Sequence, residues 1–221
     1  MCRMKKTRRR RWLKWLSFFS NDTKNESTDM TYLILGLIIF LGVHSLRMVG
    51  EGWRTRVRAS AGEAKFKGVY SVLSILGFAL IVWGFSVARQ TPVQLWSPPV
   101  AMRHVAALLT LISFILLAAA YVPGNSIKAR LHHPMVLGVK VWALAHLLAN
   151  GNVAHVVLFG SFLVWAIWNF AASRRRDRLT GVQYPAGSGG ATAITVVVGI
   201  GAWLAFALFL HGWLIGVRPF G

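Results

Sequence analysis

Two histidines lie within long apolar runs, where an imidazole loses its water and needs a partner. His146 lies in the run that follows Pro134, and His44 lies in the run from residue 31 to residue 49. An ionisable side chain inside a membrane span indicates a functional site by default. Its other common role is a hydrogen bond that joins two helices of a bundle. The two stretches alone leave both interpretations open.

The neighbours of these histidines suggest what the site would bind. On a helix, Trp142 lies one turn before His146 and Asn150 one turn after it, so the three share a face. Two imidazoles on different helices suit axial ligation of one haem iron, and His44 and His146 are therefore the predicted metal ligands. Arg47, one turn after His44, would pair with a haem propionate. Trp142 and Asn150 would line the cofactor site.

Acidic residues and cysteines argue against other chemistry in the apolar runs. The acidic residues, all outside those runs, are Asp22, Glu26, Asp29, Glu51, Glu63 and Asp177. Zinc sites, di-iron sites and proton-coupled transport normally place carboxylates beside the histidines. The single cysteine, Cys2, excludes an internal disulfide and a cysteine-ligated cluster. The remaining histidines are expected at the outer interface (His104, His155 and His211) or in a solvated loop (His132 and His133).

Composition places the chain in a membrane. Of its 221 residues, 55% are hydrophobic and only 6 are acidic, too few to cover the surface of a soluble domain. The net charge of +19 comes from Lys and Arg at the ends of apolar runs, so we expect a lipid bilayer and no nucleic acid as partner. We predict an all-α polytopic membrane helix bundle with about six transmembrane helices, at residues 31–49, 68–88, 101–122, 135–150, 153–172 and 191–216. A turn at residues 150–152 predicts that the fourth and fifth helices form an antiparallel hairpin.

Basic residues are divided unevenly between the two sets of loops. One set and its adjoining helix ends hold Arg47, Arg54, Arg56, Arg58, Lys65, Lys67, Lys128, Arg130, Lys140, Arg174, Arg175, Arg176 and Arg178, against Arg89, Arg103 and Arg218 in the other. The positive-inside rule places the richer set in the cytoplasm. The basic tail, residues 1–29, would then lie outside, against the same rule. We therefore expect translation to start at Met30, so that residues 1–29 are an extension outside the native protein and residues 30–221 are the transmembrane domain.

Several motifs resemble those of the NnrU family of bacterial membrane proteins. They are HSLR at residues 44–47, YVPGN at 121–125, HPMVLG at 133–138 and WALAHLLANG at 142–151, and the resemblance runs from Met30 to the C-terminus. It implies a multi-pass protein of the bacterial inner membrane that supports nitric oxide and nitrite metabolism in denitrification. The family is similar to the plant zeta-carotene isomerase, a membrane haem b protein whose histidine ligands correspond to His44 and His146. The resemblance therefore implies haem b as the cofactor.

Three functions stay open at this point. The first is a haem b protein that senses or handles nitric oxide, and the second is a haem-dependent isomerase of a carotenoid-like polyene. The third is a non-enzymatic assembly factor whose partners are components of a nitrogen-oxide reductase. The sequence does not decide whether the protein is an enzyme.

Overall fold

Every regular element in the described part of the chain, residues 30–220 of the computed structural model, is a helix. After a first span at Met30–Val49, the helices are α2 (Glu51–Ala61), α3 (Glu63–Ala88), α4 (Ala101–Tyr121), α5 (Ser126–Leu131), α6 (Pro134–Ala149), α7 (Val153–Thr180), α8 (Gly189–Ala205), a π-helical turn (Phe206–Leu210) and α9 (His211–Ile215). The predicted all-α class is confirmed. Residues 1–29, and with them the expectation that they form a separate extension, lie outside the described residues.

Within residues 30–220, five helices are long and apolar enough to cross a membrane: the first span, α3, α4, α7, and the helical stretch Gly189–Ile215. The remaining predicted span is α6, which has 16 residues and therefore measures about 24 Å. Because a hydrocarbon core is about 30 Å thick, α6 is shorter than a full span. Pro134 lies in the first turn of this helix, where the backbone N–H groups have no partner within the helix and the missing N–H of proline costs nothing.

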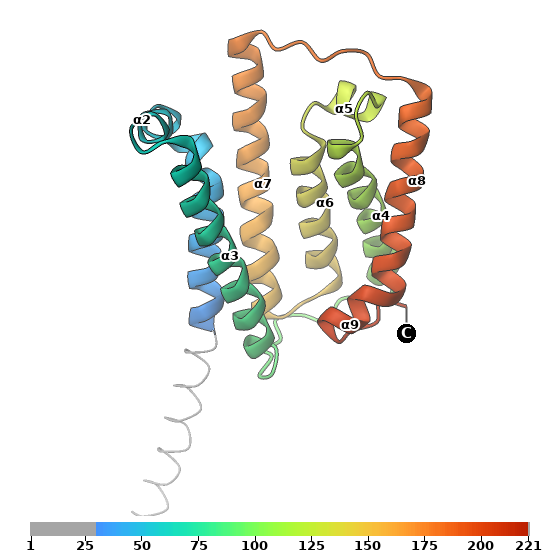
Figure 1. Cartoon of the computed structure of the whole chain (residues 1–221). Coiled ribbons are helices and arrows are strands. Elements are labelled where there is room, and N and C mark those ends of the chain that lie inside the picture. Colours follow the sequence, from blue (N-terminus) through green and yellow to red (C-terminus); the bar gives the residue numbers. More distant parts are fainter. Residues whose placement is uncertain (1–29, 221) are drawn as a thin grey trace, which may run out of the picture.

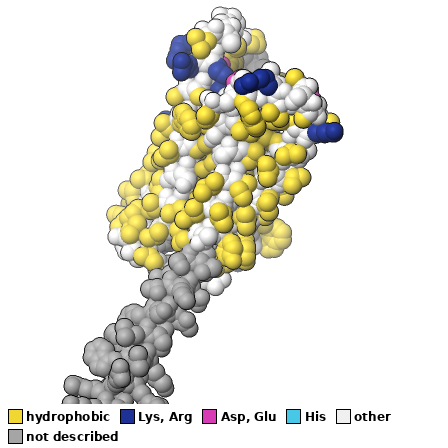
Figure 2. Space-filling view, turned by 90° about the vertical axis from the view of Figure 1, so that its left-hand side faces the viewer, with side chains coloured by type: hydrophobic (Ala, Val, Ile, Leu, Met, Phe, Trp, Pro, Cys, Tyr) yellow, Lys and Arg dark blue, Asp and Glu magenta, His cyan; other side chains and the backbone are white. Residues whose placement is uncertain are grey.

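The surface matches a multi-pass membrane protein. Figure 2 shows hydrophobic side chains over most of one face, with Lys and Arg gathered at one end. Large apolar side chains on the outside of α8, such as Ile194 and Val197, are more than half exposed, at 59% and 69%. Such a face is stable in lipid and not in water.

The bundle has two distinct ends (Figure 1). One, the basic end, carries α2, α5 and the C-terminal end of α7. The opposite one, the turn end, carries the α6–α7 turn and α9. The basic residues of the richer set belong mainly to the elements of the basic end, so the fold separates charge in the way that the positive-inside rule describes.

Glycines let the helices approach closely. A Cβ at Gly36 of the first span would lie 2.6 Å from the Ile81 backbone nitrogen on α3, and one at Gly77 would lie 2.8 Å from that of Phe40. Gly199 of α8 packs on Ile115 of α4 in the same way, at 2.6 Å. Small residues allow such contacts in membrane bundles, where van der Waals packing drives association.

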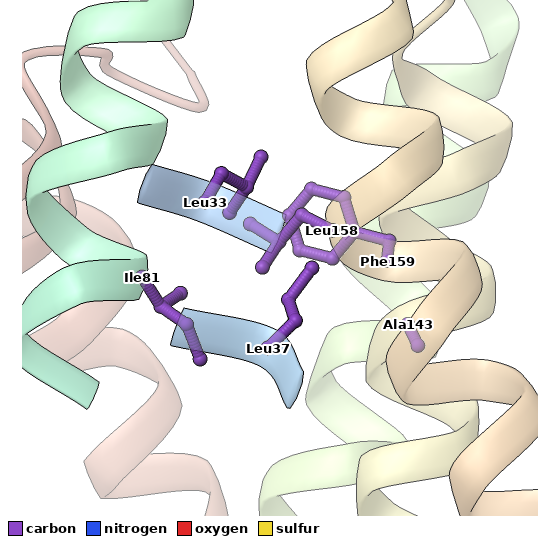
Figure 3. Packing of buried hydrophobic residues seen from close by; sticks show 6 residues of the cluster. All are labelled: Leu33, Leu37, Ile81, Ala143, Leu158 and Phe159. Atoms are coloured by element: carbon purple, nitrogen blue, oxygen red, sulfur yellow. The ribbon is translucent and has the colours of Figure 1, made fainter. Parts of the chain in front are cut away.

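A buried apolar core joins the first span to α3, α6 and α7. Figure 3 shows its members: Leu33, Leu37, Ile81, Ala143, Leu158 and Phe159. Phe40, Trp142 and Phe162 pack around this cluster. The core therefore lies directly beside the helices that carry His44 and His146.

Candidate functional site

His146 is held on α6 with one ring nitrogen committed and the other free. Its Nδ1 donates to the Trp142 carbonyl oxygen, one turn earlier, at 2.9 Å. The ring stacks on Phe159 of α7 at 4.4 Å between centroids and lies 5.1 Å from the Trp142 ring. Nε2 has no hydrogen-bond partner within residues 30–220. With Nδ1 as the donor, Nε2 carries a lone pair, which is the state of a histidine that binds a metal.

His44 repeats this arrangement on the first span. Its Nδ1 donates to the Phe40 carbonyl oxygen at 2.6 Å, and its ring stacks on that of Phe40 at 4.2 Å. Trp165 of α7 meets the imidazole edge-on at 6.4 Å, and the Trp165 Nε1 is buried without a hydrogen-bond partner in the described residues. An acceptor from outside the chain would satisfy this donor.

Aromatic rings connect the two histidines across the core. The row runs from Phe40, beside His44, to Phe162 at 6.0 Å and then to Trp142 at 5.6 Å, beside His146. The imidazoles also lie at different levels, because His44 contacts Trp165 and His146 contacts Phe159, six positions earlier on α7. Six residues of helix correspond to about 9 Å. The two rings thus belong to one continuous aromatic layer but do not face each other across a short gap.

Asn150 contacts His146 through the backbone. Its Nδ2 donates to the His146 carbonyl oxygen at 2.9 Å, which caps the end of α6. The next residue, Gly151, accepts through its carbonyl from the backbone nitrogens of Leu95 at 2.7 Å and Trp96 at 3.1 Å. A Cβ on Gly151 would overlap the Trp96 carbonyl oxygen, so only glycine fits this turn. The predicted α6–α7 hairpin is confirmed.

Arg47 lies at the basic end and faces outward. Its side chain is 64% exposed, and its Nε lies 3.9 Å from Glu51 Oε2. The structure therefore brings Trp142 to the His146 ring and Asn150 to the His146 carbonyl oxygen, but does not direct Arg47 toward the core. The role of these residues at a cofactor stays a prediction.

Two further histidines, His155 and His211, and Arg89 lie at the turn end with His146. His146 lies within electrostatic range of His155 and of His211, and His155 lies within range of Arg89. The Nδ1 of His155 donates to Asn152 Oδ1 at 2.5 Å, and the Nδ1 of His211 donates to the Val217 carbonyl oxygen at 2.6 Å. Their Nε2 atoms are therefore acceptors as well. Sequence reasoning placed His155 and His211 at an interface but did not connect them with His146.

A second cluster, at the basic end, was missed by sequence reasoning. His133 Nε2 donates to Asp177 Oδ2 at 2.8 Å, and the Tyr184 hydroxyl donates to the same oxygen at 3.1 Å. His132 stacks on Tyr184 at 4.0 Å and its Nδ1 accepts from Arg174 Nη1. The expectation that both histidines lie in a solvated loop is wrong, because Asp177 gives them a partly buried carboxylate to bind. The available signal was Asp177 itself, the one acidic residue in the sequence after Glu63.

His44 and His146 each present a ring nitrogen of the kind that binds a haem iron, although the two do not face one shared gap. In both imidazoles Nδ1 is fixed by a carbonyl oxygen and Nε2 is left free, and both rings lie among aromatic side chains. Within residues 30–220, no group of three or more His, Cys, Asp or Glu side chains would hold a free metal ion. The packing adds one condition. For one iron to reach both imidazoles, the Phe40 and Phe162 rings between them would have to move.

Comparison with known proteins agrees with the motifs. The family model described as NnrU protein matches residues 32–219. Neither a curated protein nor a solved structure matches the chain. Since the family model covers most of the sequence, the chain belongs to the NnrU family.

Proposed function

We propose that this protein is a haem b-binding protein of the bacterial inner membrane that handles nitric oxide or nitrite in denitrification. The observation that carries the proposal is the shared state of His44 and His146. Each lies on a separate helix of the bundle, commits Nδ1 to a carbonyl of its own helix, and keeps Nε2 free. Membership of the NnrU family supports the proposed setting.

The protein's own residues would orient the ligands and exclude water. The Trp142 carbonyl and the Phe159 ring fix the plane of His146, while the carbonyl and ring of Phe40 fix His44. The surrounding rings form an apolar layer that would keep solvent from a bound iron and strengthen polar interactions there. When bound, the haem would supply an iron that takes nitric oxide as a further ligand.

The positions of the two histidines differ, and this decides which of them is the primary iron ligand in the proposal. His146 lies toward the turn end, where the Arg89 guanidinium has an unpaired nitrogen, whereas His44 is displaced along α7 by about 9 Å. His146 is therefore the primary ligand in this proposal. His44 is the second ligand if the intervening rings move, and otherwise a position is left open for a small gas.

Absorption spectroscopy of the purified full-length protein, expressed with haem supplied, tests the proposal. The wild type should show a Soret band, and His146→Ala should abolish it while the protein stays folded. His44→Ala should either abolish the band or convert a six-coordinate spectrum to a five-coordinate one. His104→Ala is the matched control, because His104 is exposed on α4 and away from the aromatic layer. A wild type without a Soret band would contradict haem binding and leave a non-enzymatic assembly role beside nitrogen-oxide reductase components.

A further inference from the structure

Arg89 is an arginine at the turn end whose hydrogen-bonding capacity is only partly used. It follows α3 directly, and its Nη2 donates to the Ile215 carbonyl oxygen at 2.9 Å. The guanidinium lies over the Phe85 ring at 5.4 Å from the centroid. Its Nε is buried and has no hydrogen-bond partner among residues 30–220. A buried donor on a charged group is costly to leave unpaired, so an acceptor is missing here.

The charge balance at this end indicates an anionic acceptor. Arg89 and His146 both act electrostatically on His155. The acidic residues within 30–220 are Glu51, Glu63 and Asp177. Glu51 and Asp177 belong to elements of the basic end, and Glu63, at the start of α3, pairs there with Arg58 of α2. No side chain in the described part of the chain therefore neutralises Arg89. Carboxylates and phosphates both match the planar guanidinium fork, and the haem proposed above carries two carboxylates.

Arg89 and the proposed ligand His146 are joined by contacting rings. Phe85, under the guanidinium, lies 5.1 Å from His155 and 6.3 Å from Phe159, and Phe159 stacks on His146. An anion bound at Arg89 would thus lie beside the layer that surrounds the imidazole. Arg47, by contrast, is exposed and already near Glu51 at the opposite end.

We infer that Arg89 binds the propionate carboxylates of the haem, so that they point toward the turn end of the bundle and not toward Arg47. The inference rests on the proposed haem binding. Arg89 also ties the end of α3 to the C-terminal segment through Ile215, and a purely structural role for it must be separated by the experiment.

The test compares haemin with haemin dimethyl ester, in which both carboxylates are blocked. Each is titrated into the full-length apo-protein in detergent, and the Soret change gives the Kd. The wild type should bind haemin about 10-fold or more tightly than the diester, as expected for hydrogen bonds to a charged group. Arg89→Gln should weaken haemin binding to the level of the diester and leave the diester Kd within about twofold. Arg89→Lys should keep part of the preference, because a point charge lacks the fork geometry.

Arg103→Gln is the matched control, since Arg103 is an exposed arginine near the start of α4 and outside the aromatic layer, and both Kd values should stay unchanged. Equal weakening of haemin and diester by Arg89→Gln would show a structural role and overturn the inference. The inference would also be overturned if the wild type bound haemin and the diester equally well. The same holds if Arg47→Gln, and not Arg89→Gln, removed the preference for haemin over the diester. If the wild type binds neither compound, haem binding itself fails, an outcome distinct from all of these.

Discussion

The two ends of the bundle each carry a group of histidines, but they satisfy them differently. At the basic end His133 and Tyr184 both donate to Asp177, and Arg174 donates to His132. At the turn end His146, His155 and His211 each donate one Nδ1 hydrogen to a carbonyl oxygen of the backbone or of Asn152. Their second ring nitrogens, and the Nε of Arg89, find no hydrogen-bond partner within residues 30–220.

This difference separates a structural cluster from a candidate binding site. The basic-end cluster contains its own carboxylate, so its charges and donors are matched within the protein. It fastens the loop after α7, through Tyr184, to the start of α6, through His133. The turn-end group has the Arg89 guanidinium and the ring lone pairs but no acid within residues 30–220, so a ligand with a metal ion and carboxylates would complement it.

The two ends also differ in what holds them together. In the basic-end cluster the contacts of His133, Asp177 and Tyr184 run between side chains, whereas the α6–α7 turn is held through the backbone of Gly151, whose carbonyl accepts from the Leu95 and Trp96 nitrogens. A backbone change at Gly151 should therefore disrupt the α6–α7 turn, and a side-chain change at Asp177 should disrupt the basic-end cluster.

Gly151→Ala should have the largest effect of the stability variants. The added methyl would overlap the Trp96 carbonyl oxygen, a backbone atom that cannot rotate away, and overpacking of this kind costs about 1–3 kcal/mol. We expect a cost near the upper part of that range and a weakened Soret band, because the end of α6 must shift. Denaturant titration followed by circular dichroism measures the first, and the haem spectrum the second.

Gly160→Ala provides the matched comparison for this variant. A Cβ at Gly160 of α7 meets nothing within 4 Å, so alanine should be neutral or stabilise the helix by about 0.5–1 kcal/mol. Equal stability of the two variants would show that the turn end is not held by its backbone.

Asp177→Asn should destabilise the basic end more mildly. The amide keeps the shape of the side chain but removes the charge that accepts from both His133 and Tyr184. A loss of about 1 kcal/mol is expected, because the carboxylate is 15% exposed and only part of each hydrogen bond is lost. The Soret band should stay unchanged, since the cluster lies at the opposite end from His146.

Glu51→Gln serves as the reference for charge removal at the same end. Its side chain is 49% exposed and its ion pairs are with surface arginines, so the expected change is within about 0.5 kcal/mol. A stability loss in Asp177→Asn no larger than this would contradict the role given to the basic-end cluster.

Hydropathy and turn residues predicted the helices well because both act locally. Pro134 starts α6, and the break at residues 150–152 separates it from α7, as periodicity and breakers indicate. Local spacing also placed Trp142 beside His146. The contacts that local spacing did not predict join residues far apart in the sequence. The contact of Asp177 with His133 joins residues 44 positions apart, and that of Arg89 with Ile215 joins residues 126 positions apart.

Arg47 also shows what helical spacing cannot predict. Its helical spacing placed it on the face of His44, but it lies near the end of its helix, where a long side chain reaches water and meets Glu51. Helical spacing describes direction around the axis and not depth, so it did not distinguish an inward arginine from an exposed one.

Raising the pH provides the mildest way to separate the two ends, through Tyr184. Burial, and then the hydrogen bond to Asp177, raises the pKa of the Tyr184 phenol above its ordinary value. Because the folded pKa exceeds the unfolded one, the stabilisation is fully present below about pH 10 and is lost as the pH rises through the folded pKa. The difference in tyrosinate absorbance between wild type and Tyr184→Phe isolates this residue from the other tyrosines. Asp177→Asn should lower the Tyr184 pKa only part of the way, because burial remains. A Tyr184 that titrates at or below its ordinary pKa would mean that the phenol does not donate to Asp177, and the basic-end cluster would then lose its link to the loop after α7.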